Sequence, residues 1–467
     1  MIDGPKPYAE MKGSDVAWLG SVPAHWEVRR GKWLFRNRKV LNSSRAETNV
    51  LSLTLRGVVN NDPDDPEGLV PKDYGTYQLF RKDDLVFKLI DLENLRTSRV
   101  GLVHEDGIMS SAYVRLSQAH SGLQRYFFLQ YYDLYQRGIF NQLGAGVRST
   151  LGASDLLDLP IAVPPRDEQA AIVRFLDHAD RRIRRAIATK QKLIRLLEEQ
   201  KQAIIHHAVT RGLDPDARLK PSGVEWLGDV PEHWTVYRIK QVTQILRGKF
   251  THRPRNDPSL YDGQYPFIQT GEVARSGKAI TTYRQTLNER GLEVSKMFPI
   301  GTLVMTIAAN IGEVAILDFE ACFPDSVVGF VPRDSVERDY LYYLFTAMKQ
   351  ELLREAPVNT QGNLNVDRIG CRGIALPPVE EQRLIVLSIE KRTAEMDAVI
   401  DRSSREISLL REFRVRLTAD VVTGKLDVRA VAIELPVMVE AADNEFDAEE
   451  ENEDDSMEDI AAEDQAA

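Results

Sequence analysis

The polar side chains of this sequence form clusters that combine cations with amides and hydroxyls. The densest cluster runs from Arg247 to Arg255 and has a glycine between Arg247 and Lys249. Lysine and arginine contact phosphates, and amides and hydroxyls can read base edges in the major groove. Each cluster alone is typical of a polar loop, but several in two regions favour DNA binding. The candidates of this kind are Arg96, Thr97, Ser98, Arg99, Arg148, Ser149, Thr150, Arg247, Lys249, Thr251, His252, Arg253, Arg255, Gln269, Thr270, Asn359, Thr360, Gln361 and Asn363.

Motifs of catalytic, nucleotide-binding and metal sites are missing from the sequence. No stretch matches the P-loop pattern, and Gly144-Ala-Gly146 lacks the third glycine and the preceding strand of a dinucleotide or methyl-donor loop. His206 and His207 are adjacent, so on a helix they point in different directions and cannot share a metal ion. We therefore expect no catalytic centre and no metal or cofactor held by this chain.

Two segments that could position these clusters are versions of one another. Residues 159–212 and 374–424 each begin with an apolar run, continue with Pro-Pro-x-x-Glu-Gln and become long charged and apolar stretches. Pro164 corresponds to Pro377, a shift of 213 (377 − 164). Proline suits the first helical turn, the acids after it complement the helix dipole, and a glycine near the far end suits a C-cap. Each segment is therefore predicted to be one long helix.

Apolar residues recur at steps of three and four along both predicted helices, with charged residues on either side. This is the coiled-coil pattern. Two polar residues, Lys190 and Ser403, interrupt it at equivalent positions (403 − 190 = 213). They lie at the midpoints of the two seams, so an antiparallel pair in full overlap would set them opposite each other. The expected contact residues are Ile172, Leu176, Ile183, Lys190, Leu197, Ile204, Ile389, Met396, Ser403, Leu410 and Leu417.

A second motif recurs with a different shift. Residues 18–26 read Trp-Leu-Gly-Ser-Val-Pro-Ala-His-Trp, and residues 226–234 read Trp-Leu-Gly-Asp-Val-Pro-Glu-His-Trp, a shift of 208 (226 − 18). We call these the first and second tryptophan motifs. Between each motif and the following helix the two halves share little sequence. A repeated frame that carries two different inserts suggests two modules of one kind that recognise two different things.

The inserts mix short strand-like runs with turns, and each ends in a helical stretch, as α+β domains do. The first long helix leads to the second globular domain and the second helix returns. The predicted fold is therefore α+β, with two globular domains separated by two long antiparallel coiled-coil helices and related by a pseudo-two-fold axis. The predicted segments are a globular domain at 1–160, a helix at 161–213, a globular domain at 214–376, a helix at 377–430 and an acidic tail at 431–467.

The net charge of −10 comes from the end of the chain. From Glu434 onward there are fifteen Asp and Glu and no Lys or Arg, so the remainder carries +5 (−10 + 15). An acidic block with few aromatic residues is typical of a disordered tail. A mildly positive body is compatible with nucleic-acid binding, although the charge alone does not require it.

The cysteine count and the hydropathy pattern indicate a cytoplasmic protein. Cys322 and Cys371 are the only two cysteines, which excludes a disulfide framework and suggests a reducing compartment. The best apolar run, residues 300–317, contains Asn310 and Glu313 and is not expected to cross a membrane. The first sixteen residues lack the apolar core of a signal peptide.

The repeated frame resembles the DNA-specificity subunit of type I restriction–modification systems. The features that carry this resemblance are the tryptophan motifs and the Pro-Pro-x-x-Glu-Gln helices, each present twice, and it covers essentially residues 15–430. In the second insert, residues 267–271, 306–312 and 360–364 are also similar to family patterns, which adds Asn310 to the candidate DNA-binding residues. The acidic tail departs from the family pattern.

The resemblance implies a non-catalytic subunit of a methyltransferase and endonuclease complex. Each globular domain would be a target recognition domain that contacts one half of a split double-stranded DNA sequence, and the helices would fix the spacer between the halves. Two methylation subunits would dock on the frame and bring S-adenosylmethionine. Two motor–nuclease restriction subunits, with ATP and Mg, would join for cleavage.

Two other classes of function stay open at this point. A self-sufficient restriction–methylation enzyme would need a methyl-donor loop and nuclease carboxylates, which the sequence lacks. A protein-binding coiled-coil scaffold, or a DNA-mimicking regulator acting through the acidic tail, would not read a sequence itself.

The frame also predicts where the two ends of the chain meet. Only a short segment separates the first long helix from the second tryptophan motif. The equivalent place after the second helix, near Asp427, can be filled by the first tryptophan motif. Residues 426–433 are therefore expected beside residues 8–26, with Val428, Val431 and Ile433 buried by the contact.

Overall fold

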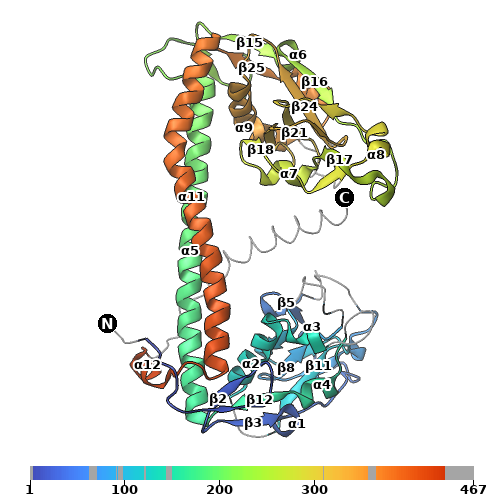
Figure 1. The fold of residues 1–467 in the computed structure, drawn as a ribbon, viewed down its shortest axis with the longest axis vertical. Coiled ribbons are helices and arrows are strands. Elements are labelled where there is room, and N and C mark those ends of the chain that lie inside the picture. Colours follow the sequence, from blue (N-terminus) through green and yellow to red (C-terminus); the bar gives the residue numbers. More distant parts are fainter. Residues whose placement is uncertain are drawn as a thin grey trace. The chain divides into compact units, whose positions relative to one another are not determined.

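A computed structural model describes residues 4–62, 71–90, 92, 98–119, 123–143, 150–308, 310–355 and 364–436. The described chain divides into two compact units. Unit 1 comprises residues 4–190 with 405–436, and unit 2 comprises residues 191–404. Each unit has a mixed α and β globular part, together with a portion of each of two long helices (Figure 1).

The globular part of unit 1 is built on small antiparallel sheets. Its four-stranded sheet, in the order β4-β11-β8-β9, shares one core with helix α2, including Leu85, Phe87, Tyr126 and Tyr131. The elements are β1 (Met11–Gly13), β2 (Ser21–Pro23), β3 (Glu27–Arg30), α1 (Gly31–Leu34), β4 (Phe35–Arg36), β5 (Leu51–Thr54), β6 (Gly57–Asn60), β7 (Gln78–Phe80), β8 (Leu85–Phe87), β9 (Val100–Leu102), β10 (Gly107–Met109), β11 (Val114–Gln118), α2 (Gln124–Gln136), α3 (Ile139–Leu143), α4 (Ala153–Asp158) and β12 (Pro160–Val163).

The globular part of unit 2 has two larger sheets, in the orders β16-β24-β21-β22-β18 and β19-β17-β23-β20. Helix α9 packs on the first sheet through Tyr340, Leu344 and Phe345. The elements are β13 (Leu219–Pro221), β14 (Asp229–Pro231), β15 (Thr235–Arg238), α6 (Ile239–Val242), β16 (Thr243–Arg247), β17 (Tyr261–Phe267), α7 (Thr270–Arg275), β18 (Ala279–Ile280), β19 (Gln285–Leu287), α8 (Glu289–Glu293), β20 (Met297–Phe298), β21 (Leu303–Thr306), β22 (Val314–Leu317), β23 (Ala321–Cys322), β24 (Val327–Pro332), α9 (Arg338–Glu355), α10 (Val366–Cys371) and β25 (Gly373–Leu376).

The two repeated segments form the long helices α5 (Arg166–Arg211) and α11 (Val379–Val422), of 46 and 44 residues. Each begins directly after its Pro-Pro pair and has two acids in its first turn, where they complement the helix dipole. The helices are therefore shorter than the predicted segments 161–213 and 377–430. The apolar residues before each proline pair instead form β12 and β25, which pair with β3 and β15 just after the tryptophan motifs.

The long helices run antiparallel within unit 1. Asp180 pairs with Arg414 at 2.5 Å, and Lys190 pairs with Glu406. The residue numbers therefore rise along α5 while they fall along α11, and in unit 2 Lys201 pairs with Asp397. The partner of Lys190 lies three residues from Ser403 on α11, close to the residue expected opposite it.

The seam between the helices contains more polar residues than the sequence pattern suggested. Of the expected contact residues, Ile172, Leu176, Ile183, Ile204, Ile389 and Ser403 are buried, whereas Lys190, Leu197, Met396, Leu410 and Leu417 are partly exposed. Gln191 and Thr393 are also buried, at 8% and 5% exposure. Buried polar groups at single seam positions favour one register over others.

The motif glutamate of α5 joins the first tryptophan motif to the long helix. Glu168, which is 4% exposed, accepts hydrogen bonds from Nε1 of Trp26 at 2.9 Å and from the hydroxyl of Tyr8, and its Oε2 lies 2.8 Å from Nε2 of His25. A carboxylate removed from water is stabilised when donors surround it. Burial and the neighbouring Glu168 raise the pKa of Tyr8 well above its usual range, so Tyr8 stays a donor.

The motif glutamine binds the globular part to the same helix end. Gln169 donates from Nε2 to the carbonyl oxygen of Pro164 at 2.9 Å and accepts from the backbone N–H of Leu123 at 3.1 Å. Leu123 precedes the first turn of α2, whose backbone N–H groups have no partner inside the helix. The motif therefore fixes where α2 meets α5.

The equivalent glutamate and glutamine of α11 make similar hydrogen bonds in unit 2. Glu381 accepts from Nε1 of Trp234 at 3.0 Å and lies 2.8 Å from Nε2 of His233. Gln382 donates to the carbonyl oxygen of Pro377 and accepts from the backbone N–H of Glu337, which precedes α9. No tyrosine donates to Glu381 among the described residues, and its side chain is 28% exposed. In each unit, the tryptophan motif is therefore hydrogen-bonded to the Pro-Pro-x-x-Glu-Gln motif at the start of a long helix. We call this contact the joint of the unit.

The C-terminal segment returns to the first tryptophan motif, as predicted. The backbone N–H of Asp427 donates to the carbonyl oxygen of Lys6 at 2.7 Å, and Val428 is fully buried in the core that includes Trp26. Val431, which was also expected to be buried, is only partly buried. The prediction that Ile433 is buried is wrong, because helix α12 (Arg429–Glu434) leaves it 79% exposed and buries Ala432 instead. The helix extends into the segment expected to be a tail, whose residues 437–467 lie outside the described residues.

Candidate nucleic-acid interface

The first half of the cation cluster of unit 2 lies on a short extended segment. This segment is hydrogen-bonded to another segment of the same unit. The backbone N–H of Gly248 donates to Val327 and that of Lys249 to Phe323. A Cβ at Gly248 would stand 1.9 Å from the carbonyl oxygen of Pro324, so only glycine fits. Arg247 and Lys249, on either side of it, are exposed. The glycine therefore allows two backbone segments of the protein to lie close together.

The second half of this cluster is held by carboxylates. Arg255 pairs with Asp325 at 2.5 Å, and Arg253 lies 3.6 Å from the same side chain. His252 lies 3.1 Å from Asp257, and Thr251 is exposed. The hydrogen bonds of Asp257, first those from Ser259 and then that of His252, lower the pKa of its carboxyl. These pairs order the segment and reduce its net charge.

The amide candidates of unit 2 fall in two places. Gln269 precedes α7 and donates from Nε2 to Gln285 at 2.5 Å, and Thr270 begins that helix. Asn310 lies in the turn between β21 and β22, where its carbonyl oxygen accepts from Thr306.

The turn that contains Asn310 lies next to the end of another candidate loop. The backbone N–H of Leu364 donates to the carbonyl oxygen of Ile307 at 2.8 Å. Ile307 and Leu364, which belong to the segments 306–312 and 360–364 that resemble family patterns, are therefore in direct contact. The remaining candidates of this loop, Asn359, Thr360, Gln361 and Asn363, lie outside the described residues.

The candidate DNA-binding residues of the first insert that the structure describes are less accessible to DNA than those of the second insert. Ser98 and Arg99 are 2% and 1% exposed, so neither side chain presents a surface to DNA in this conformation. Arg99 is close enough to Tyr135 of α2 to affect its pKa: burial raises the pKa of Tyr135, and Arg99 opposes this rise. Thr150 is exposed. Arg96, Thr97, Arg148 and Ser149 lie outside the described residues.

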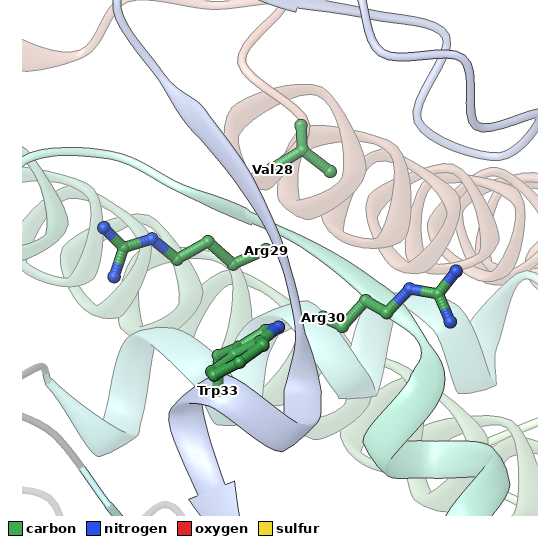
Figure 2. A pocket seen from close by; sticks show the side chains of 4 residues that line it. All are labelled: Val28, Arg29, Arg30 and Trp33. Carbon is green, nitrogen blue, oxygen red and sulfur yellow. The ribbon is translucent and has the colours of Figure 1, made fainter.

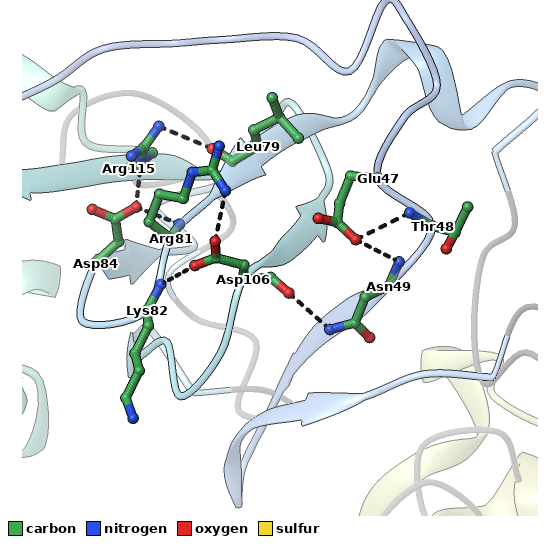
Figure 3. A network of polar contacts seen from close by, with 9 residues as sticks. All are labelled: Glu47, Thr48, Asn49, Leu79, Arg81, Lys82, Asp84, Asp106 and Arg115. Atoms are coloured by element: carbon green, nitrogen blue, oxygen red, sulfur yellow. Dashed lines mark hydrogen bonds and ion pairs between the residues drawn. The ribbon is translucent and has the colours of Figure 1, made fainter.

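A network of polar contacts in unit 1 holds the ends of its strands together (Figure 3). Asp106 accepts from Nη1 of Arg81 at 2.6 Å, and its carbonyl oxygen accepts from Nδ2 of Asn49 at 2.8 Å. Arg115 donates to the buried Asp84 at 2.6 Å. Burial raises the pKa of the Asp84 carboxyl in spite of this arginine.

Exposed polar side chains extend from this network. Asn60 donates from Nδ2 to Oδ1 of Asn49 at 3.1 Å and to Glu105, and its Oδ1 lies 3.0 Å from Nε2 of His104. Amides and carboxylates of this kind can read adenine and cytosine edges. The sequence did not reveal this group, because His104 lies 44 residues from Asn60 along the chain and no spacing rule connects them.

An open pocket lies beside the first tryptophan motif. Val28, Arg29, Arg30 and Trp33 line this pocket of about 510 Å³. Figure 2 shows Arg29 and Arg30 extending to opposite sides of β3, and Trp33 is 61% exposed. Arg29 pairs with Glu27, and Arg30 shares Asp158 with Lys32, so carboxylates already hold both arginines of the pocket. We assign no DNA contact to this pocket.

Within the described part of the chain, no three His, Cys, Asp or Glu side chains are grouped so that they could hold a metal ion. In that part, no helix combines the length and the apolar character needed to cross a membrane.

Comparisons with known proteins agree with the repeated architecture. A family model described as the type I restriction modification DNA specificity domain matches residues 26–196 and again residues 231–400. The chain is 22% identical to the putative type I restriction enzyme MjaX specificity subunit of Methanocaldococcus jannaschii over 88% of this chain and 96% of that relative. It is 23% identical to the type I restriction enzyme EcoKI specificity subunit of Escherichia coli over 43% of this chain and 44% of that relative.

Solved structures provide a further comparison. A chain from work on complex assembly and conformational transition of the type I R-M system matches 87% of this chain and 99% of its own length, with a TM-score of 0.62. At 18% identity this likeness concerns the fold.

Proposed function

Since the chain belongs to the type I restriction–modification DNA specificity family, we propose that it selects the DNA sequence on which its complex acts. The observation that carries this function is the repeated joint between the tryptophan motif and the long helix. The family model matches once in each half, and each match includes one joint and one insert.

Each globular domain, taken as residues 1–160 and 214–376, is proposed to be a target recognition domain for one half of a bipartite site. In both joints a glutamate accepts a hydrogen bond from a tryptophan Nε1 and lies next to a histidine, whereas the sheets of the two units differ in strand number and order. A constant support with different inserts suits two different half-sites. Exposed cations would contact phosphates and position the duplex, and exposed amides would read bases.

The helices α5 and α11 are proposed to fix the spacer between the half-sites and to be related by a pseudo-two-fold axis. Helices of about 45 residues at roughly 1.5 Å per residue extend on the order of 65 Å, which allows one to two turns of duplex between half-sites. The ion pairs Asp180–Arg414 and Lys201–Asp397 support a defined register.

The same helices are proposed to bind two methylation subunits. Leu196 on α5 and Leu409 on α11 occupy the same place in the repeat (409 − 196 = 213), and they are 54% and 62% exposed. An exposed leucine at equivalent positions in both units suits two copies of one partner. Two restriction subunits would complete the complex.

The catalytic chemistry is proposed to belong to those partners. The methylation subunits would bind S-adenosylmethionine and the restriction subunits ATP and Mg, while this chain would act in the cytoplasm without a catalytic centre.

Exchange of one insert tests this function. Residues 26–159 are replaced by the insert of another family member, and methylated positions are mapped in host DNA. We expect one half-site to change while the other half-site and the spacer stay the same. If both half-sites change together, or if the complex methylates without sequence preference, the proposed function is wrong.

A further inference from the structure

The fold of unit 2 brings one more lysine to the cation cluster. Lys296 lies 47 residues after Lys249 (296 − 249), directly before strand β20. The hydroxyl of the preceding Ser295 donates to the carbonyl oxygen of Lys249 at 2.8 Å, and the backbone N–H of Thr251 donates to Val294 at 3.0 Å. The two lysines are therefore on neighbouring segments.

A stack of two buried aromatic rings orients Lys296. Phe298 and Phe323 are fully buried and stack with centroids 3.7 Å apart. Nζ of Lys296 lies 5.5 Å from the centroid of Phe298, and the backbone of Lys249 is hydrogen-bonded to Phe323. Both lysines thus border the same rigid support, and a charge held on such a support loses little conformational freedom on binding.

Three cations near the Phe298–Phe323 stack have no carboxylate partner among the described residues. Arg247, Lys249 and Lys296 are exposed and form no ion pair among the described residues. The carboxylates that pair with the cluster are Asp257 and Asp325. Arg253 and Arg255 share the carboxylate of Asp325, so the ion pairs of the described residues do not neutralise Arg247, Lys249 or Lys296.

We propose that Lys296 contacts a DNA phosphate together with Arg247 and Lys249, and that these three side chains form a phosphate-binding strip at the second half-site. This inference rests on the proposed function. Phosphate contacts set the register of the protein on the duplex and carry no sequence information. The strip therefore positions the DNA while other residues of unit 2 read its bases.

The test is the salt dependence of DNA binding by the complex assembled with its methylation subunits. Lys296→Met keeps the aliphatic stem over Phe298 and removes the charge. Loss of one phosphate contact lowers the slope of log K against log salt by about 0.9. Between 50 and 200 mM salt, the variant should therefore lose roughly three- to fourfold less affinity than the wild type. The methylated sequence should stay the same.

Two controls accompany this variant. Lys296→Arg retains the charge and should keep the wild-type slope. Lys391→Met removes an exposed lysine of α11 in the same unit and should also keep it. Thermal unfolding of the Lys296→Met complex should match the wild type.

The results that overturn the inference are distinct from those that overturn the function. If the wild-type complex binds its target with a normal salt slope and Lys296→Met keeps that slope, the phosphate strip is wrong while the function stands. A changed methylated sequence in Lys296→Met would also overturn it, because Lys296 would then read bases. A wild-type complex without specific DNA binding would overturn the proposed function, and this inference with it.

Discussion

The backbone N–H of Asp427 donates a hydrogen bond to the carbonyl oxygen of Lys6, so residues 421 positions apart (427 − 6) meet in unit 1. Arg429 adds a contact over the ring of Tyr8, with Cζ 5.4 Å from its centroid. Tyr8 in turn donates to Glu168 at the start of α5. The two ends of the described chain are therefore joined by non-covalent contacts, whereas in unit 2 the corresponding elements follow one another along the chain.

Circular permutation should preserve function because of this arrangement. A chain opened within residues 215–220, with its old ends joined, keeps both joints. We expect the permuted protein to assemble with its methylation subunits and to direct methylation to the same sequence. A permuted chain opened within α9 is the control and should fail to fold. A correctly folded permutation with a different methylation site would contradict the prediction.

Deletion of residues 428–433 should destabilise unit 1. Val428 and Ala432 are 0% and 2% exposed, and loss of two buried apolar side chains costs about 2–4 kcal/mol of unfolding free energy. Urea unfolding of the full chain measures this change. Removal of residues 437–467 alone, which leaves the described contacts intact, should cause no such loss. Equal stability of the two truncated chains would show that the contact at the chain ends does not matter.

Glu168→Gln should lower stability more than Glu381→Gln. Glu168 is buried and meets three donors, so replacing one acceptor oxygen by an NH₂ group leaves a donor unpaired, at a cost of about 1–3 kcal/mol. Glu381 meets two donors and is partly exposed, so water can replace part of the loss. Chemical denaturation, with the exposed Glu395→Gln as the control, compares the variants. The reverse order of effects would refute the burial argument.

Acidification should remove the contribution of Asp427 to the stability of the folded protein. The hydrogen bond from Arg429 lowers the pKa of Asp427 in the folded protein, although partial burial opposes it. The folded state therefore binds this proton less readily than the unfolded state. Its stabilisation is present above the ordinary aspartate pKa and is lost as the pH falls through the lower, folded-state pKa. Asp427→Asn should be less stable than the wild type at pH 7, and this difference in stability should disappear as the pH falls below the folded-state pKa of Asp427. A pH-independent difference would exclude this linkage.

Lys190→Leu should stabilise the helix pair and loosen its register. Lys190 is partly exposed and pairs with Glu406, an ion pair worth about 1 kcal/mol or less. A leucine in the seam should outweigh that loss and raise the thermal midpoint by a few degrees. Methylation mapping should then show additional spacer lengths, because a polar seam residue fixes register. Lys192→Leu is the matched control, and a single unchanged spacer in Lys190→Leu would contradict the role in register.

Leu196→Glu and Leu409→Glu should each weaken binding of one methylation subunit. Burial of a leucine contributes about 1.5–3 kcal/mol, so each variant should reduce one of two binding steps at least tenfold. Analytical ultracentrifugation of the mixtures measures the stoichiometry. Leu353→Glu, at an exposed leucine of α9, is the control. Two methylation subunits bound with wild-type affinity in both variants would place the docking surface elsewhere.

The frame could be read from the sequence because its signals are local or repeated. Proline pairs followed by acids mark the start of α5 and α11, and the constant shifts of 213 and 208 reveal two copies of one unit. The repeat alone also predicted that the end of the chain returns to the first tryptophan motif. In the second copy a tryptophan motif follows the end of a long helix, so the end of the other long helix was expected beside the first tryptophan motif.

The contacts inside each unit required the tertiary structure, because they join residues that no spacing rule connects. Glu168 and Trp26 are 142 residues apart, and neither motif by itself indicates that one accepts a hydrogen bond from the other. The sequence also could not distinguish buried from exposed cations. Arg99 and Arg247 stand in similar polar stretches, yet the fold encloses Arg99 beside α2 and leaves Arg247 at a strand end in water. Burial depends on which elements pack above a side chain, and packing is decided by the whole domain.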